Sequence, residues 1–147
     1  DKSTPLAEEA RLLINFKQIF IVLTGNAAQK YGDKLDKHQQ LLLALADILI
    51  EIYFTESGIL RTLKNCDRFG VDSQKIQIAM TKAYLYEATD TIAKKGKEII
   101  LNMCDKEEQK QMMSVLHKKL QYHEWPDLID LKTQIADKLI EENKYCF

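Results

Sequence analysis

The feature that most constrains the fold is the scarcity of helix-breaking residues. The 147 residues include only two prolines and five glycines, and apolar residues recur every three to four positions along nearly the whole chain. That spacing gathers apolar side chains on one side of a helix, whereas a half-buried strand needs them at every second position. The sequence therefore predicts an all-α protein.

Turn-forming residues divide the chain into about five helices, three long and two shorter. Short connections between long helices make neighbours antiparallel. We therefore expect one domain over residues 1–147, an up-and-down bundle of the first three helices with the last two packed on it. The expected helices cover about residues 4–31, 33–65, 72–103, 105–123 and 126–143.

Capping residues support several of these boundaries. Thr4 followed by Pro5 suits the beginning of the first helix, because proline is well tolerated at the first helical position. Asp72 is placed to cap the third helix. Asp105 and Glu108 have the spacing of a capping box, in which two residues satisfy each other's backbone N–H groups.

The third predicted helix carries a narrow apolar stripe with spacings of three, four or seven residues, which is typical of a bundle seam. The fourth has an apolar arc of its own, and we expect Trp125 and Pro126 to separate it from the fifth. The stripe consists of Ile78, Leu85, Ala88, Ile92, Ile99 and Met103, and the arc of Met112, Met113, Leu116 and Leu120.

Composition excludes several classes of function. The net charge of −1 and the pI of about 6.4 provide no field that would attract nucleic acid. No run approaches the roughly 18 apolar residues of a membrane span, and the acidic start is unlike a signal peptide. Three unpatterned cysteines, Cys66, Cys104 and Cys146, fit reduced thiols in the cytoplasm better than a disulfide framework.

The segment ADILIEIYFTESGILR, residues 46–61, holds three carboxylates within an apolar run. At about 100° per residue, Asp47 and Glu51 share one face with Arg61. Asp47 and Glu51 repel each other unless a cation from a neighbouring helix lies between them. Glu56 falls on the opposite side, within an apolar arc formed by Leu42, Leu45, Leu49, Ile52, Leu60 and Leu63.

Because an unpaired buried carboxylate costs several kcal/mol, Glu56 needs a partner. We expect a structural acid that meets Lys17 or a tyrosine hydroxyl, with a functional acid as the alternative. Asp47, Glu51, Glu56 and Arg61 are thus the candidate structural or interface residues.

Other site chemistries are not supported. A dimetal bundle site needs a Glu-x-x-His pair on each of two helices, and none of His38, His117 and His123 has a glutamate three residues before it. No cysteine pairs with a histidine at zinc-like spacing, and no glycine-rich phosphate loop is present. We assign no catalytic, cofactor-binding or metal-binding residue.

Three segments resemble a known family: ADILIEIYFTESGILR, then KAYLYEATDTI in the third helix, and IADKLIEENKYCF at the end. In this order they are similar to the carboxy-terminal extension of acyl-CoA dehydrogenases of the very-long-chain type, and the last resembles bacterial members. The A-D-x-x-I-E-x-Y pattern from Ala46 to Tyr53 is similar to one in the very-long-chain class, and the order of the three segments carries the resemblance. The resemblance covers essentially all 147 residues.

This resemblance implies a helical auxiliary domain that lacks the catalytic core. In the family, FAD, the thioester substrate and the catalytic glutamate belong to the preceding part of the enzyme, so no catalytic residue is carried over. We expect a non-catalytic domain that supports subunit association or positions the flavoenzyme in fatty acyl-CoA oxidation. The implied partners are its own catalytic core and sister subunits, or a second copy in a homodimer.

Two alternatives remain open from the sequence. One is a free-standing helical protein with a site around Glu56. The other is a peripheral membrane or interaction module that uses the basic amphipathic helix at 105–123, with Lys106, Lys110, Lys118 and Lys119 opposite its apolar arc. A bundle helix with a solvated basic face explains the same pattern, so a membrane surface is the less favoured partner.

Overall fold

The computed structural model describes residues 4–147, and all regular structure in this part of the chain is helical, which confirms the all-α prediction. Residues 1–3, with which the predicted single domain begins, lie outside the described residues. Three long helices and two shorter ones follow one another along the chain: α1 (Ala7–Tyr31), α2 (Gln39–Phe69), α3 (Lys75–Met103), α4 (Lys106–Lys119) and α5 (Leu128–Glu142).

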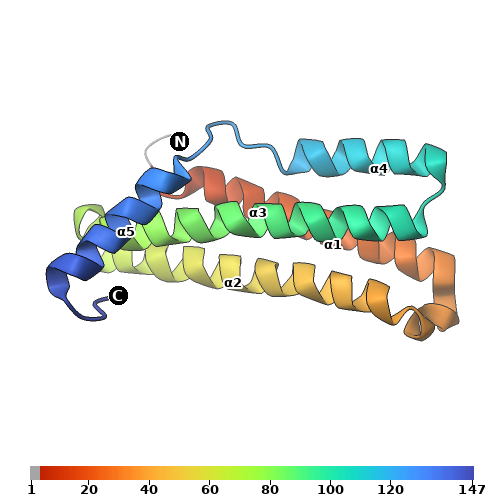
Figure 1. The fold of residues 1–147 in the computed structure, drawn as a ribbon, viewed down its shortest axis with the longest axis horizontal. Coiled ribbons are helices and arrows are strands. Elements are labelled where there is room, and N and C mark those ends of the chain that lie inside the picture. Colours follow the sequence, from red (N-terminus) through yellow and green to blue (C-terminus); the bar gives the residue numbers. More distant parts are fainter. Residues whose placement is uncertain (1–3) are drawn as a thin grey trace.

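The helices form a bundle with α3 at its centre (Figure 1). Helices α1, α2 and α3 run alongside one another and pack in all three pairs, as predicted. Helix α4 lies along α1 and α3, and α5 crosses one end of the bundle obliquely and packs on α3. Two short 3₁₀ segments, η1 (Gly32–Lys37) and η2 (Val71–Gln74), connect the long helices.

The core is a continuous apolar cluster to which the first four helices contribute. Phe16 of α1, Ile48 of α2 and Ile92 of α3 are completely buried, and Leu116 of α4 is nearly so. Burial of each such side chain contributes about 1.5–3 kcal/mol. The predicted seam of α3 is confirmed, because five of its residues are buried and only Ile78 is partly exposed.

The first helix begins two residues later than predicted. Leu6, not Thr4, precedes the first helical residue, and its backbone is left-handed with φ of 63°. The turn buries the Leu6 side chain, and its carbonyl accepts the N–H of Ala10 at 2.9 Å. Burial of this leucine accounts for a backbone conformation that non-glycine residues rarely adopt. Glu8 and Glu9 lie in the first turn, where the positive end of the helix dipole favours negative charge.

The second helix starts later and ends later than predicted, at Gln39 and Phe69. Residues 32–37 form η1 instead, which begins at Gly32 with φ of 49°. The Tyr31 ring stacks on His38 with 3.7 Å between centroids. At the other end Gly70 has φ of 86°, which stops the helix.

The predicted capping roles differ between helices. Asp72 does not cap α3, because η2 intervenes; its carboxylate lies 3.7 Å from Lys75 Nζ. The capping box of α4 is confirmed: Asp105 accepts the N–H groups of Glu107 and Glu108, while Glu108 accepts that of Asp105.

A linker of residues 120–127 separates the last two helices and contains Trp125 and Pro126, as expected, but α4 ends before residue 123 and α5 begins after residue 126. Helix α4 ends at Lys119, and Asp127 caps α5 by accepting the N–H of Asp130 at 3.0 Å. Aspartate is a strong N-cap, which explains why α5 starts after it. Helix α5 has no fully buried residue; its half-buried Leu128, Leu131 and Ile135 lie at helical spacing.

Gly96 of α3 marks a close approach between α3 and α4. A Cβ atom at this position would lie 2.9 Å from a methyl carbon of Leu116, which is itself buried in the core. The corresponding atom at Gly58, in the middle of α2, would meet nothing closer than 3.9 Å. Two helical glycines of the same chain therefore differ in whether a methyl group fits.

We predict that Gly96→Ala lowers the free energy of unfolding by about 1–2 kcal/mol, because the overpacked Leu116 must move. The matched control Gly58→Ala should raise it by about 0.5–1 kcal/mol through improved helix propensity. Urea unfolding followed by circular dichroism measures both. Stabilisation by both alanines would show that α3 and α4 are less closely packed than described.

Candidate functional site

The predicted acids Asp47 and Glu51 both face α3. Lys95 Nζ lies 3.4 Å from Asp47 Oδ2, and the Tyr84 hydroxyl donates to Glu51 Oε2 at 2.9 Å. Burial, together with this hydrogen bond, raises the pKa of Tyr84 to about 12. A cation from a neighbouring helix is present as expected, but it meets Asp47, while a neutral hydroxyl satisfies Glu51.

Glu56 faces α1. Lys17 Nζ lies 2.6 Å from Glu56 Oε1, so one of the two expected partners is found. The expected burial is wrong, because the Glu56 side chain is 40% exposed. The reason is that the buried side of α2 is rotated from the predicted arc: Leu49 and Leu60 point outward, and Glu56 lies at the edge of the interface.

Arg61, the fourth predicted residue, lies exposed on the outer side of α2 and forms no ion pair with any residue in the described part of the chain. It borders a shallow depression together with Gly58, Thr62 and the two carboxy-terminal aromatic residues Tyr145 and Phe147. The structure therefore does not bring the four predicted residues together. Three of them connect α2 to its neighbours, and Arg61 stands apart.

The outer side of α2 carries an apolar band, here called the outer stripe. Its side chains are between 49% and 65% exposed. They repeat at helical spacing, and only Ala46 and Ser57 lie among them, so no charge interrupts the band. A contiguous apolar surface of this kind marks interaction sites. The outer stripe consists of Leu43, Leu49, Ile50, Tyr53, Phe54 and Leu60.

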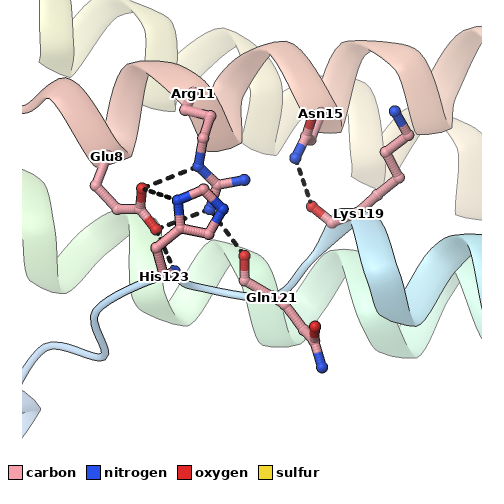
Figure 2. A network of polar contacts seen from close by, with 6 residues as sticks. All are labelled: Glu8, Arg11, Asn15, Lys119, Gln121 and His123. Atoms are coloured by element: carbon pink, nitrogen blue, oxygen red, sulfur yellow. Dashed lines mark hydrogen bonds and ion pairs between the residues drawn. The ribbon is translucent and has the colours of Figure 1, made fainter.

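A polar cluster between α1 and the linker was missed by sequence reasoning (Figure 2). Arg11 donates to both carboxylate oxygens of Glu8 at 2.9 and 2.7 Å, and also to the Gln121 carbonyl at 2.8 Å. The His123 N–H donates to Glu8 at 2.6 Å, and Asn15 donates to the Lys119 carbonyl at 2.9 Å. The spacing of Glu8 and Arg11 was the only available signal.

Two neighbouring glutamates in this region have opposite electrostatic environments. The hydrogen bonds from Arg11 hold the pKa of Glu8 at about 2, well below its ordinary value of 4.5. Glu9 is 4% exposed, and burial raises its pKa because the ionised form loses hydration. The first turn of α1 therefore combines a carboxylate that stabilises the fold when ionised with one that destabilises it.

The apolar side of α4 is not free. Leu116 and Leu120 are buried, and Met112 and Met113 pack against the core. Its basic residues remain at the surface, and Lys119 also reaches Gln18 of α1 at 2.5 Å. Insertion into a membrane surface requires an exposed apolar side, so this helix does not support the peripheral membrane alternative.

The described residues contain no group of three histidine, cysteine, aspartate or glutamate side chains that could hold a metal ion. The histidines lie apart: His38 stacks on Tyr31, His117 contacts Gln121, and His123 adjoins Glu8. Within residues 4–147, no helix has the length and apolar character needed to cross a membrane.

Comparisons with known proteins agree with this geometry. The family model described as "Acyl-CoA dehydrogenase, C-terminal domain" matches residues 15–118. A probable acyl-CoA dehydrogenase of Bacillus subtilis (strain 168) is 31% identical over 140 residues, which is 95% of this chain and 23% of that protein.

A crystal structure of an acyl-CoA dehydrogenase complexed with FAD, from Bacillus anthracis, has a similar fold. Its TM-score is 0.93 with 35% sequence identity, covering 97% of this chain and 24% of that one. The chain thus spans about a quarter of the length of these relatives.

We predict opposite effects of neutralising the two neighbouring glutamates. Because the pKa of Glu8 is lowered, its contribution is present above pH 4.5 and lost as the pH falls towards 2. Glu8→Gln should therefore cost about 1–2 kcal/mol of unfolding free energy at pH 7, after allowance for partial exposure.

For Glu9, whose pKa is raised, the unfavourable contribution is present at high pH and disappears below the ordinary value of 4.5. Glu9→Gln should therefore stabilise the protein at pH 7, and this difference should vanish in acid. Denaturant unfolding from pH 3 to 8 measures both variants. Changes of the same sign at pH 7 would contradict the two environments.

The Lys17–Glu56 pair should contribute little, because both side chains are about two-fifths exposed. A double-mutant cycle with Lys17→Met and Glu56→Gln is expected to give a coupling free energy of about 1 kcal/mol or less. Thermal unfolding at low and high salt measures it. A salt-insensitive coupling several times larger would mean that Glu56 is buried after all.

Proposed function

The chain belongs to the family of acyl-CoA dehydrogenase C-terminal domains, and we propose that it is the non-catalytic helical domain of a longer FAD-dependent flavoenzyme. In that enzyme it supports subunit association or positions the catalytic part during fatty acyl-CoA oxidation. Its partners are the catalytic core of its own chain and sister subunits, and the enzyme acts in the cytoplasm.

Two observations support a non-catalytic role for this part of the enzyme. Its relatives are about four times as long, which leaves room elsewhere for the flavin and the acyl-CoA site. Three of the four charged residues that the sequence singled out are occupied in contacts between helices: Asp47 with Lys95, Glu51 with Tyr84, and Glu56 with Lys17. FAD then belongs to the preceding core.

The observation that carries the role in association is the outer stripe of α2. Interface centres are depleted of charge and enriched in aromatic residues, and the stripe presents Tyr53 and Phe54 side by side, with ring centroids 5.5 Å apart. A domain that acted alone would be expected to keep such a band covered or interrupted by charge.

We predict that the isolated 147-residue chain is colourless after purification and turns over no acyl-CoA. In the complete enzyme, removal of this domain should leave flavin content and turnover per flavin within a few-fold of the intact protein. It should also lower the number of subunits in the assembly, as measured by sedimentation equilibrium, or the melting temperature of the enzyme. These effects follow because the chemistry and the assembly surfaces lie in different parts of the chain.

Two results would contradict the proposal. One is a flavin absorption band in the isolated chain, or turnover by it. The other is a start codon next to the codon for Asp1, which would favour a free-standing helical protein. Sequencing the gene upstream of residue 1 is the simplest decisive measurement.

A further inference from the structure

We infer that the outer stripe of α2 is the face by which this domain packs against the dehydrogenase part of its own polypeptide. The inference rests on the proposed function, and it adds the surface and its partner.

The carboxylates at the rim of the stripe each have a partner within the domain. Asp47 and Glu51 flank the stripe on one side and Glu56 on the other, and each turns towards α1 or α3. Asp47 and Glu56 are paired with lysines, and Glu51 accepts a hydrogen bond from the Tyr84 hydroxyl. Burying the two paired carboxylates requires no compensating cation from the other surface. The helix thus presents an apolar face between edges whose carboxylates have partners.

The stripe is large for a free surface. From Leu43 to Leu60 it follows α2 for roughly 25 Å. Six half-exposed side chains present on the order of 100 Å² each, or about 600 Å² in all, which reaches the upper range for the largest apolar patch of a monomer. A side chain such as Phe54 gains about 1.5–3 kcal/mol when it is fully buried. Contact with another protein surface is therefore strongly favoured.

The size also distinguishes between possible occupants. A stable complex of separate proteins buries about 800 Å² on each partner, somewhat more than this stripe offers. A partner in the same polypeptide needs less area, because a covalent connection provides an effective concentration in the millimolar range. About three quarters of the relatives' length lies outside the matched region, so a tethered partner is large enough to cover the stripe.

The charge at one end of the stripe indicates which side chains the partner surface presents. Arg61 and Lys64 continue the outer side of α2 beyond Leu60, and within residues 4–147 neither forms an ion pair. The partner surface therefore presents aliphatic or aromatic side chains along most of the stripe and carboxylates opposite these two cations. A second copy of α2 offers no such carboxylates in the stripe itself.

The test places a protease site ahead of residue 4 in the complete enzyme and measures how strongly the two separated parts bind each other. After cleavage, sedimentation velocity at increasing concentration should show the wild-type domain bound to the flavoenzyme part with a dissociation constant below the millimolar effective concentration of the tethered state. Ile50→Lys and Phe54→Lys, each made separately, should weaken this association at least 100-fold. Leu101→Lys, a similarly exposed residue of α3, is the matched control and should leave it unchanged.

Unfolding is separated from loss of contact by measuring each variant in the 147-residue chain, where helicity and melting temperature should stay at the wild-type level. Three results would overturn the inference: no association of the separated wild-type parts up to millimolar concentration, unweakened binding of both stripe variants, or equal weakening by the Leu101→Lys control. Self-association of the isolated chain that is abolished by Phe54→Lys, while the cleaved variant stays bound, would assign the stripe to a second copy instead. Absence of an upstream core in the gene would refute the proposed function, whereas these results test only the face.

Discussion

The close packing of the other helices around α3 is the constraint on which the rest of the structure depends. Helices α1, α2, α4 and α5 all contact α3, and a helix with four neighbours must be narrow where they approach. Ala79, Ala83, Ala88 and Gly96 provide this narrowness, while Leu85 and Ile92 fill the spaces between them.

Much of this architecture could be predicted from the sequence, because its signals are local. Residues a few positions apart set the apolar period of α3 and the capping box at Asp105 and Glu108. One unmet charge is enough to predict that Glu56 needs a partner such as Lys17. The family was also evident from short segments in the right order. These features require no knowledge of how the helices are oriented.

The features that prediction missed depend on how the helices are oriented relative to one another. Helix α2 has leucine or isoleucine on most of its sides, so the periodicity does not fix which side faces inward. The predicted arc therefore included Leu49 and Leu60, which belong to the outer stripe. The same ambiguity made Glu56 look buried. The contacts of Glu8 and Arg11 with the linker join residues more than a hundred positions apart, and no local pattern encodes them.

The cluster in Figure 2 has a consequence for how this domain tolerates sequence change. Its hydrogen bonds to the end of α4 and to the linker reach peptide groups: the carbonyls of Lys119 and Gln121 and the N–H of His123. Side chains at these three positions can therefore be replaced during evolution while the hydrogen bonds persist, except by proline at position 123, which lacks the N–H. The side chains that must be kept are those of Glu8, Arg11 and Asn15. The connection between α4 and α5 is therefore held in place by residues near the amino terminus.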